Sequence, residues 1–216
     1  MLPRFADNRD PNSLASQLRA RRNRQFSSLL DPLPKPWSIL DVGGTLAVWE
    51  AIGLVDQADV QITIVNLHRT DCPYANVQSI AGDARDMRDF RDSQFDMVYS
   101  NSVIEHVGNL DQMARMASEV RRVGRRYFVQ TPNRYFPIEP HFVFPMFQFL
   151  PVSVRATLVQ NFSLGWTARL PDRKRAEEEV KSIQLLSRSE FRLLFPDGQM
   201  IEEKLLGLTK SLIIWR

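Results

Sequence analysis

The sequence predicts an α/β protein whose mostly parallel sheet is doubly wound with helices. Short apolar runs alternate with longer amphipathic stretches between Trp37 and Gln130, the pattern expected when helices connect parallel strands. Near the C-terminus, two such runs are separated only by a tight connection at Gly207, which predicts an antiparallel hairpin. A stretch rich in proline and aromatic residues after Pro132 interrupts the alternation and indicates an insertion after the fifth strand.

Composition fits one globular domain over residues 1–216. The hydrophobic fraction is 44% and the charged fraction 25%, which excludes fibrous and disordered classes. Cys72 is the only cysteine, so an intrachain disulfide and a zinc site of several thiolates are excluded, and we expect no metal. The net charge of +3 is too small to indicate nucleic-acid binding.

No targeting segment is expected at the N-terminus. Residues 1–10 are charged, and no apolar run follows that could serve as a signal peptide or span a membrane. We therefore expect a cytoplasmic protein.

Charge is distributed unevenly along the chain. Residues 1–36 carry seven basic and three acidic groups, residues 37–131 carry nine and thirteen, and residues 132–216 carry twelve and nine. Two interpretations stay open. The flanks are ordinary solvated surfaces, or they form a basic rim for an anionic substrate.

The elements follow in order along the chain. An N-terminal helix through Leu30 is ended by a proline-rich connector up to residue 36. A helix is predicted over Leu110–Val123, with Asn109 and Gln112 capping its start and Gly124 ending it. The five strands of the core, residues 37–131, are expected at 38–42, 60–65, 77–80, 95–99 and 127–130.

The C-terminal third has two parts. Residues 132–186 form the insertion, which we interpret as a substrate lid or as a proline-rich surface loop. In residues 187–216, Ser187 and Glu190 form a capping box that opens a short helix ended by Pro196. Two strands at 199–206 and 209–215 complete the sheet.

Three short motifs lie where the predicted strands end. In Asp41-Val-Gly43-Gly44, glycines allow a ligand close to the backbone, and the acid can meet an ammonium group. Asp83, after the third strand, can accept from an exocyclic amine or cap a helix. His106, after the fourth strand, has a side chain whose pKa suits proton transfer, although a structural role is the alternative.

These motifs, in this order and spacing, resemble the class I S-adenosylmethionine-dependent methyltransferases, and in particular the type 11 methyltransferase-domain family. The resemblance covers roughly residues 37–131 and 187–216, and its most specific part is Phe95-Asp-Met-Val-Tyr-Ser-Asn-Ser-Val-Ile-Glu-His-Val107. It implies a Rossmann-like, seven-stranded sheet and S-adenosylmethionine as cofactor. The cofactor contacts that it implies are Asp41, Gly43 and Gly44 at the methionine moiety, Asp83 and Ala84 at adenine, and Ser100 and Asn101 near the transferred methyl.

The sequence departs from the family at two places. Thr45 and Ala47 stand where further glycines are common, so the loop is shaped differently. Asn66 replaces the acid that grips the ribose hydroxyls, and a neutral amide loses the charge-assisted bond. These departures predict weaker cofactor binding or its loss. An alternative function is therefore a non-catalytic adaptor that keeps the fold.

Candidate groups for handling the acceptor follow the fourth and fifth strands. His106, His141 and Glu139, in that order, are candidates for the base that a hydroxyl acceptor requires. Residues 142–150 are strongly apolar, which indicates core packing, an apolar pocket or contact with a membrane surface. We expect a small-molecule, glycan-like or lipid-like acceptor, and the oligomeric state stays open. A third alternative is RNA modification or binding through Arg19, Arg21, Arg22 and Arg24.

Overall fold

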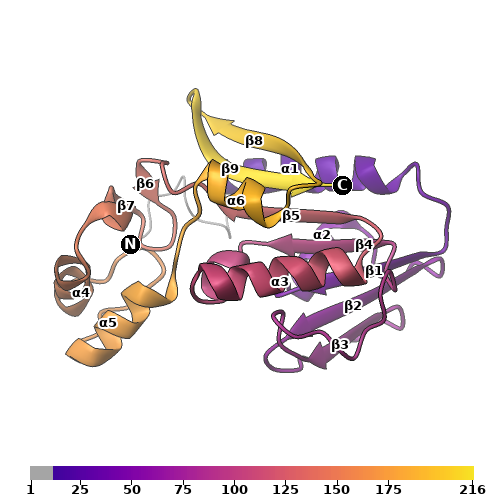
Figure 1. The fold of residues 1–216 in the computed structure, drawn as a ribbon, viewed down its shortest axis with the longest axis horizontal. Coiled ribbons are helices and arrows are strands. Elements are labelled where there is room, and N and C mark those ends of the chain that lie inside the picture. The colour runs from indigo at the N-terminus through magenta and orange to yellow at the C-terminus, as the bar shows by residue number, and fades with distance from the viewer. Residues whose placement is uncertain (1–11) are drawn as a thin grey trace.

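The computed structural model describes residues 12–216, so the expectation about residues 1–10 lies outside the described residues. A seven-stranded sheet with the order β3-β2-β1-β4-β5-β9-β8 forms its centre (Figure 1). The first five core strands pair in parallel, and β9 runs antiparallel to both of its neighbours. The predicted fold class is confirmed. The strands are β1 (Trp37–Val42), β2 (Val60–Asn66), β3 (Val77–Ala81), β4 (Met97–Asn101), β5 (Tyr127–Pro132), β8 (Gln199–Leu205) and β9 (Leu208–Trp215).

The fourth strand lies two residues later than the predicted range of 95–99. Asp96 is not paired with β1 as part of the strand. Its carboxylate instead accepts a hydrogen bond from the backbone N–H of Ser38 at 3.0 Å. The ladder with β1 begins at Met97, opposite Ile39. This shift brings Ser100 and Asn101 into the strand at its carboxyl end.

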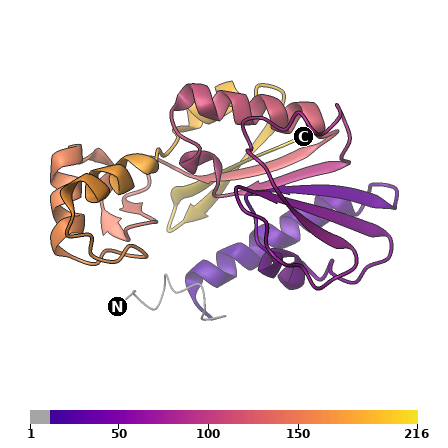
Figure 2. The same ribbon diagram turned by 90° about the horizontal axis from the view of Figure 1, so that it is seen from below.

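Helices cover both faces of the sheet, as a doubly wound fold requires. α1 (Leu14–Leu30) and α2 (Leu46–Ile52) lie on one face, and α3 (Leu110–Val123) and α6 (Arg188–Leu194) lie on the other (Figure 2). Consecutive strand residues alternate between the two layers. Ile39 packs with Phe26 and Trp49 on the α1 side, and Leu40 packs with the buried stripe of α3.

Local sequence accounts for the helices. Asn109 and Gln112 form the predicted capping box of α3, whose buried side chains are Met113, Met116, Ala117, Val120 and Val123. Gly124 is the C-cap of this helix and has an extended backbone, and a Cβ there would lie 2.5 Å from Val98 Cγ2. The capping box of Ser187 and Glu190 at α6 is confirmed as well.

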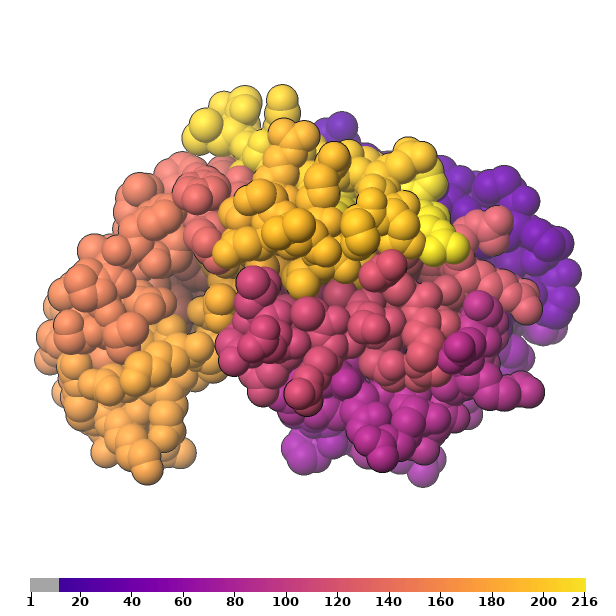
Figure 3. Space-filling view, in the orientation of Figure 1, coloured from indigo at the N-terminus to yellow at the C-terminus, as the bar shows by residue number. Residues whose placement is uncertain are grey.

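The insertion folds as a small lobe with a core of its own. It contains β6 (Ile138–Glu139), β7 (Phe144–Pro145), η3 (Phe147–Phe149), α4 (Val152–Asn161) and α5 (Arg173–Ser182). The lobe projects beyond the end of the sheet (Figure 3). Its buried core consists of Phe142, Phe147, Ala156, Val159, Ala176 and Val180.

The apolar segment 142–150 mainly serves this lobe. Phe142 and Phe147 are buried in its core, whereas Met146 and Phe149 are 50% and 45% exposed. Core packing therefore explains most of the segment. Among the described residues, no helix is both long and apolar enough to cross a membrane.

The final hairpin is closed by the two residues Leu206 and Gly207. Both have positive φ angles, 50° and 82°, which is the backbone conformation of the tight turns that match strand twist. The predicted connection at Gly207 is therefore confirmed.

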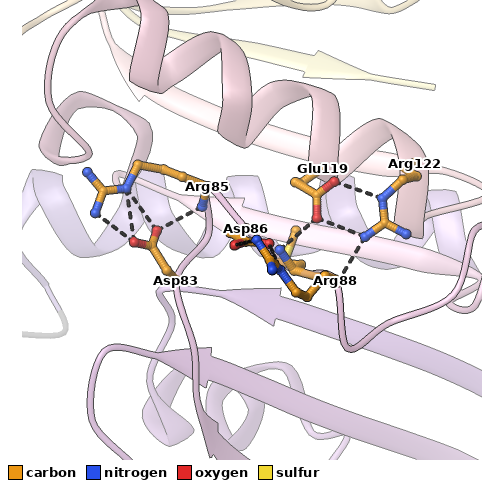
Figure 4. A network of polar contacts seen from close by, with 7 residues as sticks. Asp83, Arg85, Asp86, Arg88, Glu119 and Arg122 are labelled. Atoms are coloured by element: carbon orange, nitrogen blue, oxygen red, sulfur yellow. Dashed lines mark hydrogen bonds and ion pairs between the residues drawn. The ribbon is translucent and has the colours of Figure 1, made fainter.

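The long connection between β3 and β4 is held against α3 by charged side chains (Figure 4). Arg122 donates to the backbone carbonyls of Met87 and Phe90 at 2.9 and 2.7 Å, and it pairs with Glu119. Glu119 in turn accepts from the Met87 backbone N–H at 2.6 Å. Arg88 pairs only with Asp86, and its side chain is 80% exposed.

This difference predicts the effect of removing each arginine. Arg122→Met should lower the free energy of unfolding by about 1 to 3 kcal/mol, because two backbone carbonyls and a carboxylate lose their donor. Arg88→Met, in the same connection, should leave it unchanged because exposed ion pairs contribute little. Urea titration monitored by circular dichroism measures both values. Equal stabilities of the two variants would contradict the role of Arg122.

Candidate functional site

The turn between β1 and α2 requires both of its glycines. Gly43 has a φ of +76°, and a Cβ at this position would lie 2.5 Å from the methyl groups of Val103. A Cβ on Gly44 would lie 1.8 Å from Asp41 Oδ2. The acid and the turn are therefore packed against each other, and a side chain at either glycine would displace the loop.

Asp41 is a buried carboxylate beneath this turn. Its Oδ2 accepts from the indole N–H of Trp49 at 2.7 Å, while Oδ1 has no hydrogen-bond partner among residues 12–216. Burial raises the pKa of Asp41 to about 7, and the bond from Trp49 opposes this shift. A cationic group at the glycine turn would stabilise the ionised form.

Asn66, at the end of β2, is tied to the glycine turn. Its Nδ2 donates to the Gly44 carbonyl at 2.9 Å. An aspartate here would lack this donor and would place a negative charge beside a carbonyl oxygen. The geometry thus gives a structural reason for the amide at the position where the resemblance implies an acid.

Asp83 follows the end of β3, the strand that pairs with β2. Arg85 binds both of its carboxylate oxygens, with the shortest contact at 2.6 Å from Nη2 to Oδ2 (Figure 4). This guanidinium holds the pKa of Asp83 below its usual value. Ala84 packs against the core on the α3 side. The proposed adenine contacts therefore lie at a strand end, but Asp83 is already paired with a cation.

The two candidates at the end of β4 have different environments. Ser100 is fully buried, and its hydroxyl donates to the Val42 carbonyl at 3.1 Å, so it joins two strands. Asn101 Oδ1 accepts from Arg22 Nη1 at 2.5 Å. Arg22 is itself buried and makes a bidentate pair with Glu203 on β8.

Asn101 lies on the wall of a cavity with a volume of about 320 Å³. The cavity is enclosed by α1, by the ends of β4 and β5, by the β8–β9 hairpin and by the insertion. Its walls are mostly apolar, with His141 on the side of the insertion. Small-molecule sites typically have volumes of about 300 to 1,000 Å³ and similar linings.

His141 is held by Glu139. The Nδ1 atom of His141 lies 2.6 Å from Glu139 Oε1, and Glu139 Oε2 accepts from the backbone N–H groups of His141 and Phe142. Burial opposes protonation of the ring, but Glu139 and Glu105 raise the pKa of His141 above its usual value. A carboxylate on Nδ1 leaves Nε2 as the atom that can exchange a proton.

Glu105 and His106, both on η2 (Ile104–His106), form a cluster with His141 and Glu139. Glu105 is fully buried, its Oε2 accepts from Thr131 at 3.0 Å, and its Oε1 lies 4.0 Å from His141 Nε2. Burial raises the pKa of Glu105 to about 7. The rings of His106 and His141 meet edge to face at 4.8 Å between centroids. Burial and the neighbouring His141 lower the pKa of His106.

The spacing in this cluster bears on the expectation that there is no metal. Glu105, His106 and His141 each offer a donor atom, and these atoms lie within 4.8 Å of one another. Zinc-bound nitrogens at about 2.1 Å from the ion lie roughly 3.4 Å apart in a tetrahedron. The donor atoms are spaced more widely than in a closed tetrahedral zinc site, and the expectation that there is no metal stays a prediction.

The structure brings the predicted residues together in two groups. In the first group, Gly44 of the glycine turn contacts both Asp41 and Asn66. In the second group, His141 contacts both His106 and Glu139. Sequence reasoning missed the participation of Glu105, although its position beside His106 was a signal. It also missed the pairing of Arg22 with Glu203, since these residues are 181 positions apart.

Comparison with known proteins agrees with this geometry. Residues 42–127, from the end of β1 to the start of β5, match the model of the methyltransferase domain family. Two uncharacterized proteins from strains of Mycobacterium tuberculosis are each 41% identical to this chain over 56 residues. This match covers 26% of the chain and spans about a fifth (19%) of the relatives' length.

Several solved structures share the fold. The CurJ carbon methyltransferase matches with a TM-score of 0.61 and 10% identity over 94% of this chain and 55% of its own. The magnesium protoporphyrin IX methyltransferase of Synechocystis PCC 6803, with bound SAH, matches with a TM-score of 0.56 and 10% identity over 93% and 83%. A SAM-dependent methyltransferase from Aquifex aeolicus matches with a TM-score of 0.51 and 8% identity over 91% and 96%. Together with the match of residues 42–127 to the methyltransferase domain family, these likenesses show that the chain has the fold of S-adenosylmethionine-dependent methyltransferases.

Proposed function

We propose that this protein transfers the methyl group of S-adenosylmethionine to an acceptor bound in the cavity between α1, the hairpin and the insertion. One observation carries the proposal. His141, held by Glu139, lies on the wall of a cavity that also reaches Asn101, at the carboxyl edge of the sheet where doubly wound folds bind their ligands. The acceptor is a small molecule, or a glycan-like or lipid-like group.

The residues around the glycine turn fit the cofactor. Asp41 has an unpaired buried oxygen for an ammonium group, and the absence of side chains at Gly43 and Gly44 keeps the backbone approachable. Asn66 keeps its carbonyl oxygen for a hydroxyl while its Nδ2 supports the turn. Bound here, S-adenosylmethionine supplies a methyl group on a positively charged sulfur.

The residues of the cavity then handle the acceptor. For a hydroxyl acceptor, the oxygen forms the new bond to the methyl carbon, and the carbon–sulfur bond breaks with its electron pair remaining on sulfur. The acceptor proton passes to Nε2 of His141, and Glu139 stabilises the resulting imidazolium through Nδ1. Asn101 and the apolar walls orient the acceptor and exclude water, which contributes through positioning.

Two observations support the adaptor as a second candidate function. Asp83 is already paired with Arg85, and Asn66 is engaged with Gly44, so cofactor binding competes with existing contacts. For the RNA alternative, the four arginines of α1 do not share one surface, because Arg22 is buried against Glu203 while Arg21 and Arg24 are exposed.

Cofactor binding separates the enzyme from the adaptor. Calorimetric titration with S-adenosylhomocysteine should show saturable binding to one site, with NAD as the negative control. Asp83→Ala should weaken this binding roughly five- to 100-fold, because the adenine amine loses its acceptor. Asp86→Ala is the matched control, since Asp86 pairs with Arg88 as Asp83 pairs with Arg85 but lies three residues further from the end of β3.

Two results would count against these assignments. Equal affinities of the two aspartate variants would remove Asp83 from the adenine site. No binding of S-adenosylhomocysteine at millimolar concentration would reject the enzyme and favour the adaptor.

The pH dependence tests the base. His141 works as a base only when neutral, and its raised pKa requires the acid limb of kcat/KM to lie above about 6.5, the ordinary value of histidine. Glu139→Gln should move this limb to lower pH, because the charge that stabilises the imidazolium is removed. The maximal rate should also fall.

The matched control is His68→Gln, since His68 is exposed and lies outside the cluster. It should leave the pH profile unchanged, whereas His141→Gln should lower turnover with little effect on affinity for S-adenosylhomocysteine. An unchanged acid limb in Glu139→Gln would show that His141 is not the titrating base.

A further inference from the structure

The acceptor cavity has an uneven distribution of charge. Its described lining contains no aspartate or glutamate, but it contains Arg19, Arg22 and Lys210 at one end. The rest of the wall is mainly apolar, and it includes Leu18, Phe136, Ile138, Val143 and Trp166. A ligand that fills this space meets hydrocarbon and aromatic surface over most of its length and cations at one end.

The three cations differ in how they are neutralised. Arg22 donates to both oxygens of Glu203 and to Asn101. The carboxylate of Glu203 is therefore the counter-charge of Arg22. Among the described residues, neither Arg19 nor Lys210 has a carboxylate within ion-pair distance. Glu203 pairs with Arg22 and also attracts Lys210, so one carboxylate faces three cations and this part of the lining keeps a net positive charge.

The electrostatics of the two remaining cations reflect this imbalance. Both are half-buried, on α1 and β9 respectively. Burial lowers the pKa of Lys210, and the neighbouring Arg22 and Arg19 lower it further, whereas Glu203 raises it in part. Burial and Arg22 likewise lower the pKa of Arg19. A negative group placed between them would relieve this repulsion in a partly desolvated site, where charge-assisted hydrogen bonds are strong.

We propose that the cavity selects an acceptor with an anionic group, a carboxylate or an equivalent oxyanion, on an apolar body. The anion binds between Arg19 and Lys210, and the apolar body lies against Phe136 and Trp166, with its reacting atom toward His141. This proposal rests on the proposed function for the identity of the cavity as the acceptor site. A concave cavity of about 320 Å³ fits a small amphipathic molecule.

Two matched probes test the proposal without any methyl transfer. The first is 8-anilino-1-naphthalenesulfonate, an aromatic body with a sulfonate. The second is N-phenyl-1-naphthylamine, the same aromatic body without it. Fluorescence titration of the full chain should show saturable binding of the anionic probe that is at least tenfold tighter than binding of the neutral probe.

Variants locate the anion. Arg19→Gln with Lys210→Gln should weaken the anionic probe at least tenfold and the neutral probe less than twofold. The control combines Arg21→Gln with Lys204→Gln, which removes the same charge from exposed positions on α1 and β8, outside the cavity lining. It should change neither affinity. Trp166→Ala should weaken both probes, because it removes part of the apolar wall, and circular dichroism confirms that each variant is folded.

The outcomes are distinguishable from those for the proposed function. Equal affinities for the two probes would overturn the anionic acceptor even where S-adenosylhomocysteine binds. So would an affinity for the anionic probe that the Arg19 and Lys210 substitutions leave unchanged. Anionic-probe binding that also survives Trp166→Ala would place that probe outside the cavity and overturn the assignment as well. Failure to bind S-adenosylhomocysteine, with probe discrimination intact, would reject methyl transfer and leave the anion site standing.

Discussion

Arg22 carries a guanidinium into the protein interior, and the architecture of the site depends on how this charge is paired. Glu203 accepts from it twice and Asn101 once. Removing one partner of a buried pair leaves an uncompensated charge, which is costly. The contact therefore fixes α1 against the β8–β9 hairpin and the end of β4. Glu203 lies beside an irregularity in the β8–β9 register, and such bulges redirect side chains.

The two halves of the carboxyl edge carry opposite charge. Asp41 and Asp83 lie at the ends of β1 and β3, where the ammonium and amine groups of the cofactor would bind. Arg19 and Lys210 come from α1 and β9, on the acceptor side. Under the proposed function, the acidic middle and basic flanks of the sequence would form two sides of one site. An ammonium group of the cofactor would then bind on the acidic side, and the proposed anionic acceptor would bind on the basic side.

The cluster around His141 shows how the insertion completes the site. β5 provides Thr131, η2 provides Glu105 and His106, and the insertion provides the Glu139–His141 pair. Glu139 lies in β6, whose pairing with β7 belongs to the lobe with its own core. Under the proposed function, the insertion would supply chemistry as well as cover, because Glu139 holds the imidazole of His141 through Nδ1.

Much of the fold was predictable because it depends on local patterns. The capping boxes at Asn109 and Ser187, the stripe of α3 and the turn at Gly207 are properties of neighbouring residues, and all were identified. The fourth strand was displaced by two residues, because Asp96 bonds to Ser38 across the sheet and the pattern of apolar residues does not show this contact. The core of the insertion also lacked a regular pattern, since it is assembled from short elements.

The candidate site was predictable only in part. The glycine turn with Asp41 is a continuous motif, and its packing follows from the sequence order. The role of Asn66 depends on its contact with Gly44, and the burial of Glu105 depends on β5 and the insertion. Arg22, Glu203 and Lys210 come together only through the sheet topology. Their grouping could not be inferred from spacing along the chain.

The central claim is that the cofactor site at the glycine turn and the acceptor cavity adjoin at one edge of the sheet. A crystal structure of the complex with S-adenosylhomocysteine tests this claim most directly. We predict the ammonium group near Asp41, the backbone of Gly43 and Gly44 against the methionine moiety, and the sulfur facing the cavity beside Asn101. A ligand bound with its sulfur turned away from the cavity, or bound away from the glycine turn, would contradict the account.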